Sequence, residues 1–354
     1  MSTDTFNGWI CTGKDAPLQW GSLPLKTWDD NSVEMNITHC GICGSDIYTL
    51  DSGWGPTNYP CVVGHEIVGV ATRVGANVTK FKVGDRIGVG AQVESCLECE
   101  NCKSNQENIC LKRVIGTYNS KWYNGEKTYG GYANKWRGNQ HFVFKIPDHM
   151  TNQIAATFFC AGITTYSPLK RYEVQAGSQV GVIGIGGLGH FALMFSKAMG
   201  ATKVVALSHS DKKRQDAQSL GATDYVVTSN KQELKKFRSS LSHIICCAYH
   251  EPFDWKAYLS LLKPNGVFIL VALPDGPISG IPAALLVSKQ VRFCASMLGS
   301  PKEIEEMLEF ADKHQVKPWI NKYNMSEAPL AIKDFREGKP RYRIVLENKP
   351  ASKI

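Results

Sequence analysis

The stretch QVGVIGIGGLGHFALMFSKAMG, residues 179–200, decides the fold of this chain. It opens with an apolar, β-branched run, turns through glycines and continues with helical spacing as far as Gly200. In a G-x-G-x-x-G turn, the first glycine permits the turn, the second admits a pyrophosphate close to the backbone, and the third lets helix meet strand. A glycine-rich packing turn, the alternative, does not explain the third glycine or the strand that follows. The stretch therefore predicts a dinucleotide site made by Gly184, Gly186, Gly187, Leu188 and Gly189.

Apolar runs and helical segments alternate after this stretch. The apolar runs are KVVALS (203–208), DYVVTS (224–229), HIICCA (243–248), VFILVAL (267–273) and VRFCAS (291–296). The polar helical segment DKKRQDAQSLGA (211–222) follows the first of them. Strands separated by helices in this way are typical of a parallel, doubly wound sheet. We expect an α/β Rossmann domain over 151–297.

The rest of the chain has a different pattern. Residues 1–150 contain short strands, many glycines and prolines and few long helices, whereas 298–354 contain one good helix (302–314) and the strand-like RYRIVLE (341–347). A length of 354 residues exceeds the size at which one hydrophobic core usually stops growing. We therefore expect a second, strand-rich and metal-containing domain formed by 1–150 and 298–354.

Charge and hydropathy argue against two classes of protein. The 40 Lys and Arg residues give a net charge of +8 against 32 Asp and Glu, but no dense basic block is present, so we expect a mild preference for anionic ligands and no nucleic-acid binding. The most apolar window, 180–195, is short, rich in glycine and contains His190, which argues against a membrane span. No secretory signal is visible at the N-terminus, so we expect a cytoplasmic protein whose partner is a small molecule.

Four cysteines lie within SCLECENCKSNQENIC (95–110). A reducing cytosol disfavours disulfides, and thiolates this close together repel one another unless a cation neutralises them. Tetrahedral Zn²⁺ with four sulfurs meets that need, although an iron–sulfur cluster also takes four thiolates and spacing does not exclude it. A closed four-sulfur zinc site has no open position, so we expect Cys96, Cys99, Cys102 and Cys110 to hold a structural ion.

The residues after the second predicted strand indicate which dinucleotide is bound. An NAD site places an acidic residue at the end of this strand, and here Ser208 stands in that position. A hydroxyl can donate to a 2′-phosphate that a carboxylate would repel, and Ser210 and Lys213 add a donor and a positive charge. Asp211 lies three residues later and suits a helix N-cap. We predict NADP(H).

A second group of candidate metal ligands is spread along the sequence. Cys43 lies in HCGICGSD (39–46), His65 and Glu66 lie in VVGHEIVG (62–69), and Cys160 lies in ATFFCAGITTY (156–166). Taken singly, such residues are more often core or hydrogen-bonded structure. One histidine and two thiolates together form a known type of open catalytic zinc site.

With these motifs assembled, the sequence resembles the zinc-dependent medium-chain dehydrogenase/reductase superfamily, and within it the cinnamyl alcohol dehydrogenase-like branch of NADP-dependent alcohol dehydrogenases. The resemblance rests on CGICGSD, VVGHEIVG, VGDRIGVGAQVESCLECENC, YGGYA, GIGGLGH, LSHSDKKR and RYRIVLE, which extend in order from about residue 40 to 347. It implies a GroES-like catalytic domain beside the Rossmann domain, and a homodimer. It also implies that Cys43, His65 and Cys160 bind a catalytic zinc, with Glu66 nearby, and that the four clustered cysteines bind a structural zinc.

The resemblance also implies a mechanism. Zinc polarises an aldehyde oxygen while NADPH delivers hydride to the carbon, and the Ser45 hydroxyl passes the proton. Asp46 would orient His65, and Trp54 would flank the substrate, with ordinary aromatic packing as its alternative. Further cofactor contacts are implied for Thr164, Val271, Leu273, Ser296 and Leu298, and Arg343 would contact the pyrophosphate.

One position departs from the family pattern. Tyr48 stands where the family commonly continues its proton relay with a histidine, and a phenol carries protons poorly at neutral pH. This leaves three alternatives. Either Tyr48 and water together carry the proton, or the ribose hydroxyl of the cofactor passes it directly to solvent, or the enzyme performs 1,4-reduction of an unsaturated carbonyl. We expect carbonyl reduction and keep the ene-reductase as the alternative. A polyol dehydrogenase and a non-catalytic NADPH-binding relative are weaker alternatives, because Ser208 replaces the acid and no ligand is missing.

Overall fold

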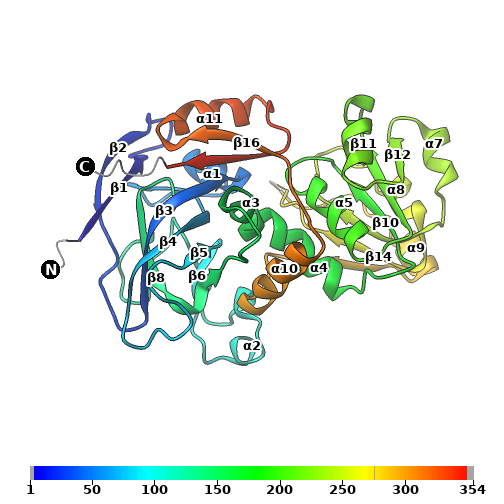
Figure 1. Cartoon of the computed structure of the whole chain (residues 1–354). Helices are drawn as coiled ribbons and strands as arrows, with labels where there is room; N and C mark the ends of the chain where they lie inside the picture. Colours follow the sequence, from blue (N-terminus) through cyan, green and yellow to red (C-terminus); the bar gives the residue numbers. More distant parts are fainter. Residues whose placement is uncertain (1–3, 275, 349–354) are drawn as a thin grey trace. The chain divides into compact units, whose positions relative to one another are not determined.

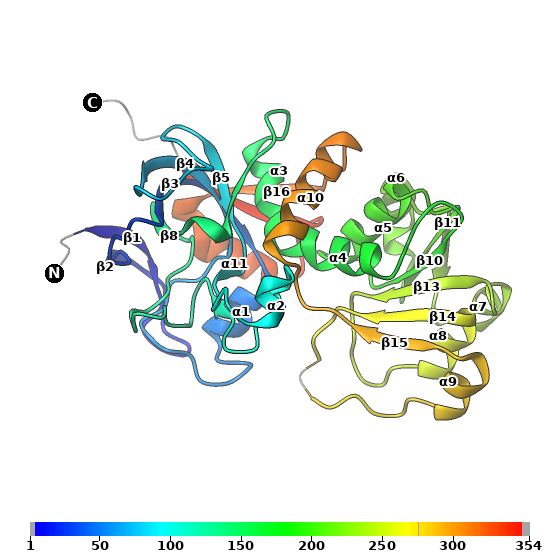
Figure 2. The same cartoon turned by 90° about the horizontal axis from the view of Figure 1, so that it is seen from below.

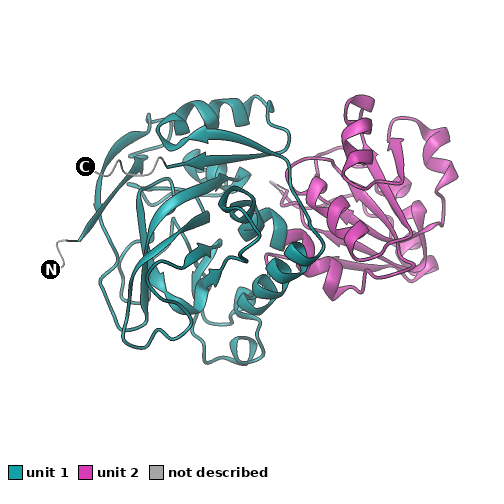
Figure 3. Cartoon of the chain, in the orientation of Figure 1, with its two compact units in different colours: residues 1–163, 299–354 teal, residues 164–298 magenta. Residues whose placement is uncertain are grey.

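The computed structural model describes residues 4–274 and 276–348. The chain forms two compact units, one made of residues 1–163 and 299–354 and the other of 164–298 (Figure 3). The division of domains from the sequence, 1–150 with 298–354 against 151–297, stays a prediction. Within the described ranges, no helix is both long and apolar enough to cross a membrane.

The first unit is built on a mixed sheet in the order β16-β17-β3-β4-β5-β9, with β8 also pairing with β3 (Figure 1). Its long central strand β3 buries Val33, Met35 and Ile37 in the core of this unit. The strands of this sheet are β3 (Ser32–Ile42), β4 (Glu66–Val74), β5 (Arg86–Val89), β8 (Lys135–Asn139), β9 (Val143–Lys145), β16 (Ile320–Asn324) and β17 (Arg343–Glu347). Two small antiparallel sheets pair β1 (Thr5–Ile10) with β2 (Gln19–Pro24) and β6 (Gln92–Glu94) with β7 (Ile115–Gly116).

Short helices connect these strands. They are α1 (Gly44–Leu50), α2 (Glu100–Lys103), η1 (Glu107–Ile109), η2 (Gln140–Phe142), α3 (Asn152–Thr157), η3 (Phe158–Gly162), α10 (Pro301–Lys313), η5 (Met325–Glu327) and α11 (Ala328–Arg336). The predicted helix over 302–314 corresponds to α10, which begins with a capping box between Ser300 and Glu303.

The second unit contains one parallel sheet in the order β12-β11-β10-β13-β14-β15 (Figures 1 and 2). Counted along the chain from β10, this is the order 3-2-1-4-5-6 of a Rossmann fold, which confirms the predicted fold class. The strands are β10 (Gln179–Ile183), β11 (Lys203–Ser208), β12 (Asp224–Val227), β13 (Leu241–Cys246), β14 (Leu262–Leu270) and β15 (Arg292–Ala295).

The central strands β10, β11 and β13 are buried almost without interruption, as expected of a parallel sheet covered on both faces. Among its helices, α5 packs against β10 and β11, whereas α8 and α9 pack against β14. The helices are α4 (Ile163–Arg171), α5 (Gly189–Ala198), η4 (Asp211–Lys213), α6 (Arg214–Ser219), α7 (Lys231–Lys236), α8 (Trp255–Leu261) and α9 (Ala283–Lys289).

Candidate active site

The first unit brings Cys43, His65, Glu66 and Cys160 together. Their potential ligand atoms all lie within 4.8 Å of one another, and the two Sγ atoms are 3.6 Å apart. His65, Glu66 and Cys160 are buried. Residues separated by more than a hundred positions in the sequence therefore form one cluster.

Sheet pairing places two of these ligands side by side. β3 ends at Ile42, just before Cys43, and β4 begins at Glu66, just after His65. The antiparallel register sets Gly41 opposite Glu66, and a side chain at Gly41 would collide with the Glu66 carboxylate. Cys160 comes from η3, a π-helical turn between α3 and α4, and such widened turns are frequent at functional sites.

Burial and close spacing shift the protonation of the cluster. A hydrogen bond from Cys160 holds the pKa of Cys43 well below its usual range, and the same bond keeps the pKa of Cys160 well above it. Burial raises the pKa of Glu66 to about 7, although Arg343 opposes the shift. Burial disfavours a charge on His65, but Asp46 and Cys43 raise its pKa to about 9. Without a metal ion, protons on Cys160 and His65 therefore stabilise the thiolate of Cys43 in this buried group.

A metal ion fits this set of residues. Nε2 of His65 and Oε2 of Glu66 are buried and have no hydrogen-bond partner among the described residues. One imidazole and two thiols are the donors of an open zinc site, and the Glu66 carboxylate offers a further oxygen.

The Asp46 carboxylate forms hydrogen bonds with the backbone of both segments that carry the candidate ligands Cys43 and His65. It accepts hydrogen bonds from the N–H of Cys43 (2.8 Å), from the N–H of Gly64 (3.1 Å) and from the Tyr132 hydroxyl (3.0 Å). Gly64 immediately precedes His65. The predicted direct orientation of His65 by Asp46 stays a prediction, whereas the backbone contacts give Asp46 a clear structural role.

Arg343 lies against the same cluster. It forms an ion pair with Oε1 of Glu66 and donates to the carbonyl of Ile42 at 3.0 Å. Both side chains of the ion pair are buried. Arg343 thus holds one oxygen of Glu66 in place, and its predicted contact with a cofactor pyrophosphate stays a prediction.

Ser45, Tyr48 and Trp54 lie on α1 or just after it. The Ser45 Oγ lies 3.6 Å from the Cys43 Sγ, so Ser45 lies beside the cluster. Tyr48 and Trp54 stack with ring centroids 4.7 Å apart and planes 10° apart, and both rings are exposed. The predicted relay and pocket residues therefore form one aromatic stack.

The four predicted structural ligands form a second cluster. The Sγ atom of Cys110 lies 3.4 Å from that of Cys96 and 3.9 Å from that of Cys99, and Cys96 and Cys102 are also 3.9 Å apart. Backbone N–H groups, that of Cys102 foremost, lower the pKa of Cys99 to about 6, which favours a thiolate. This geometry suits an ion with four sulfur ligands.

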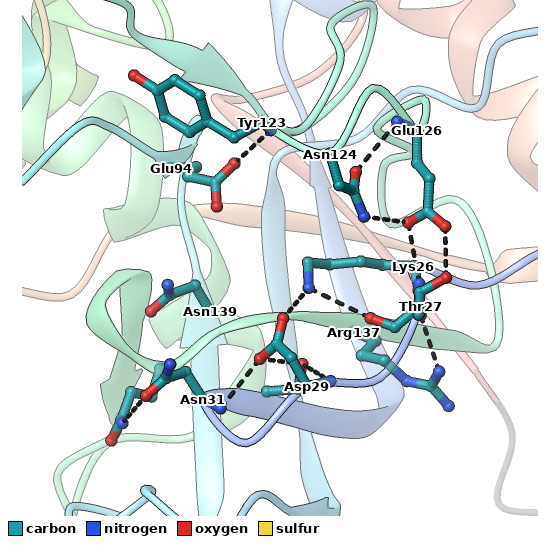
Figure 4. A network of polar contacts seen from close by, with 12 residues as sticks. Lys26, Thr27, Asp29, Asn31, Glu94, Tyr123, Asn124, Glu126, Arg137 and Asn139 are labelled. Carbon is teal, nitrogen blue, oxygen red and sulfur yellow. Dashed lines mark hydrogen bonds and ion pairs between the residues drawn. The ribbon is translucent and has the colours of Figure 1, made fainter.

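The loop 119–131 makes hydrogen bonds to the N-terminal segment of the same unit. Figure 4 shows Glu126 accepting hydrogen bonds from Thr27 and from Asn124. The N–H of Tyr123 donates to Glu94 at 2.9 Å.

The second unit carries the glycine turn at the carboxyl end of β10. Gly184 has a φ of 83°, which favours glycine, and its N–H donates to the Leu207 carbonyl at 3.0 Å. A side chain at Gly186 would meet nothing within 4 Å, whereas one at Gly189 would collide with the Gly184 carbonyl. The turn therefore leaves the backbone of Gly186 open to a ligand and brings the helix close to the strand.

The predicted phosphate-binding residues follow β11. Ser208 is the last residue of that strand, and Lys213 donates to the carbonyl of Ile185 within the glycine turn at 2.5 Å. Ser210, not Asp211, occupies the N-cap of η4, because Asp211 begins the helix and pairs with Arg214. This corrects the N-cap predicted for Asp211.

The other predicted cofactor residues of this unit lie past the carboxyl ends of parallel strands or in α4. Ligands of such sheets bind at that edge. Ser296 has a buried hydroxyl without a hydrogen-bond partner among the described residues, and Leu298 has a φ of 54°. Val271 and Leu273 follow β14, and Thr164 is the second residue of α4.

Two tyrosines beside the metal cluster were not predicted from the sequence. Tyr118 stacks on the imidazole of His65, and Tyr132 donates to Asp46. Burial and then the charge of Asp46 keep the pKa of both phenols well above their usual range. Only Tyr132 lies in a motif that the sequence analysis used, YGGYA (129–133).

Comparison with known proteins gives consistent matches over both units. Residues 29–148 match the family model described as an alcohol dehydrogenase GroES-like domain, and 187–313 match that of a zinc-binding dehydrogenase. The chain is 40% identical to NADP-dependent alcohol dehydrogenase C 1 of Mycolicibacterium smegmatis, covering 97% of this chain and 98% of that protein. It is 38% identical to 8-hydroxygeraniol dehydrogenase of Catharanthus roseus, covering 96% and 94%.

Solved structures agree with this result. A cinnamyl alcohol dehydrogenase from Sorghum bicolor superposes with a TM-score of 0.92 at 35% identity, covering 97% of this chain and 98% of that one. The cinnamyl alcohol dehydrogenase of Helicobacter pylori complexed with NADP(H) superposes with a TM-score of 0.88 at 34% identity, with the same coverage.

Proposed function

The chain belongs to the alcohol dehydrogenase family that joins a GroES-like domain to a zinc-binding dehydrogenase domain, and from this premise we propose that it is a zinc-dependent, NADP(H)-linked alcohol dehydrogenase or aldehyde reductase. Its substrate is an aldehyde or alcohol, of the aromatic, allylic or medium-chain type. The observation that carries the proposal is the buried cluster of Cys43, His65, Glu66 and Cys160.

The residues of the first unit have distinct roles in this proposal. Cys43, His65 and Cys160 would hold zinc, which when bound supplies a Lewis acid for the carbonyl oxygen. The Ser45 hydroxyl, beside Cys43, passes the proton that the product oxygen gains on reduction. Arg343 holds Glu66 by an ion pair, and Asp46 holds the backbone around Cys43 and His65.

The residues of the second unit would bind the cofactor, which supplies the hydride. Open backbone at Gly186 accommodates a pyrophosphate, and the N-terminus of α5 favours its negative charge. Ser208 and Lys213 would contact the 2′-phosphate, with Ser210 nearby. The names of the relatives, which specify NADP, support this choice.

We also propose a second, structural zinc at Cys96, Cys99, Cys102 and Cys110, and a cytoplasmic homodimer. The four close sulfurs support the ion. The edge strand β15, whose Arg292 and Ala295 are exposed, offers a free edge of the described sheet to a second copy.

The second candidate function is 1,4-reduction of an unsaturated carbonyl. It is favoured by Tyr48, which occupies the relay position with an exposed ring stacked on Trp54. Hydride transfer to the β-carbon would give an enolate that gains its proton at the α-carbon, so the oxygen would need no immediate proton from the relay and a phenol at this position would matter less.

Cinnamaldehyde distinguishes the two reactions. With NADPH we expect oxidation of the cofactor and formation of cinnamyl alcohol, and with NADH we expect much slower turnover. Chromatographic identification of the saturated aldehyde as the product would establish the alternative reaction instead. In the control, Cys160→Ala should abolish turnover but should still bind NADPH, measured by the change in NADPH fluorescence. A fully active variant would refute the catalytic zinc site.

A further inference from the structure

If His65 binds a metal, other residues must hold its imidazole ring in the right orientation. Such rings are usually held by a hydrogen bond at the second nitrogen, and losing that support weakens the site. Here the Asp46 carboxylate receives the N–H groups of Cys43 and Gly64 and the hydroxyl of Tyr132. These contacts locate the backbone of the ligand segments but do not set the rotation of the His65 ring.

The ring of Tyr118 lies parallel to the imidazole. The two centroids are 5.3 Å apart and the planes differ by 6°, which is the geometry of an offset stack. Rotation of the imidazole about its Cβ–Cγ bond would lose part of this contact, so the stack favours the observed ring orientation.

The backbone around Tyr118 is fastened on both sides. The buried Thr117 donates through its hydroxyl to the Gly90 carbonyl, and its N–H donates to the Ala91 carbonyl at 3.0 Å. On the other side, the Asn119 side chain accepts from the N–H of Asn58 at 2.8 Å. The ring is therefore held against His65 by a loop that is itself held against the sheet.

The hydroxyl of Tyr118 is buried and makes no direct hydrogen bond to the residues that the structure describes. It nevertheless lies near Asp46, since burial and then the charge of that carboxylate hold the pKa of the phenol well above its usual range. The hydroxyl of Tyr132 donates to Asp46 directly. The contact of Tyr118 with His65 is made by its ring, and Tyr118→Phe separates that contact from any effect of the hydroxyl on Asp46.

We propose that Tyr118 is a positioning residue, whose ring sets the orientation of the His65 imidazole in the metal site. The proposal rests on the assignment of Cys43, His65, Glu66 and Cys160 as metal ligands, and it adds a residue outside that set. Removing the ring should loosen the metal and disturb its coordination geometry, whereas removing only the hydroxyl should not.

The test uses the full-length protein with cobalt(II) in place of zinc. In Tyr118→Leu we expect altered visible cobalt bands, metal release to a chelator about 10-fold faster and a kcat about 10-fold lower, with an unchanged KM for NADPH. Tyr118→Phe should rescue the bands and the release rate. Because the four-cysteine site contributes the same bands to every variant, difference spectra isolate the His65 site.

Tyr129→Leu is the matched control, because Tyr129 lies in the same unit and packs its ring on Phe6, with centroids 5.6 Å apart. It should lower the melting temperature without changing the cobalt bands. The proposal is overturned if Tyr118→Leu keeps the wild-type bands and release rate, or if Tyr118→Phe behaves like Tyr118→Leu. Wild-type protein that holds no cobalt beyond the four-cysteine site would overturn the metal assignment itself, and the role of Tyr118 with it.

Discussion

Ser208 is the residue at which the choice of cofactor can be tested. It ends β11 next to the glycine turn, and Lys213 reaches back to that turn through the Ile185 carbonyl. In Ser208→Asp, a carboxylate would repel the 2′-phosphate and would accept a hydrogen bond from an unmodified ribose. We expect kcat/KM with NADPH to fall about 10- to 100-fold relative to NADH, since a hydrogen bond to a charged group contributes about 1.5–3 kcal/mol.

Ser219→Asp controls for the added charge. Ser219 is exposed and is the last residue of α6, so the same substitution is made in the same unit but not beside Ser208 or its paired residue Val227. Steady-state kinetics with both cofactors should show no change of preference in this variant. An unchanged NADPH preference in Ser208→Asp would remove Ser208 from the 2′-phosphate site.

The sequence identifies side chains whose chemistry is rare more easily than side chains that act by position. The motifs around Cys43, His65 and Cys160 predicted a cluster that the fold does assemble. Nothing near Tyr118 distinguishes it from any other loop tyrosine, because its stacking on His65 depends on how two distant segments pack. The ion pair of Arg343 with Glu66 was missed for the same reason.

Strand β8 shows how one buried charge links several elements of the first unit. Arg137 is almost fully buried, pairs with Glu34 on β3 and also reaches Asp4 at 2.6 Å. It donates to the carbonyl of Lys26 at 2.8 Å (Figure 4). Removing one partner of a buried ion pair leaves the other charge uncompensated. Arg137→Met should therefore lower the free energy of unfolding of this unit by about 3–5 kcal/mol, measured by denaturant unfolding.

Lys145→Ala is the matched control on the adjacent region of the sheet. Lys145, on β9, is exposed and lies 4.0 Å from Asp85. A long pair whose lysine is largely exposed to solvent contributes about 0–1 kcal/mol, so this variant should unfold almost like the wild type. If both variants lost the same free energy of unfolding, the contacts of Arg137 would contribute no more to stability than the Lys145 pair does.

Elements were predictable where local signals and packing agree. The helix α10 combines Ser300 and Glu303 in a capping box with an apolar stripe, so its position was close to the predicted 302–314. Strand β14 starts at Leu262, five residues before the predicted run, although Pro264 and Gly266 suggest a turn. Pairing of Leu241 with Leu262 extends the strand there, and such pairing is not visible in a single sequence.

The whole molecule divides its chemistry between two units with separate cores. The core of the first unit surrounds β3 and β4, and that of the second surrounds the parallel sheet. Both cysteine-containing clusters lie in the first unit, whereas the glycine turn and Ser208 lie in the second. The proposed metal sites and most of the proposed cofactor site therefore belong to different folding units, which follows from the division of the chain and not from any single motif.

This division predicts different responses in calorimetry of the full-length protein. A ligand that binds only the folded state stabilises it by about 2.7 kcal/mol at 100 times its dissociation constant, so saturating NADP⁺ should raise the unfolding temperature of the second unit by several degrees. A zinc chelator should lower that of the first unit, because the four thiols of the Cys96–Cys110 segment would repel one another without an ion. NADH at the same concentration serves as the control and should raise the unfolding temperature of the second unit by less than NADP⁺ does. A chelator that left every transition unchanged, in protein shown to have lost its zinc, would contradict a structural role for the four-cysteine site.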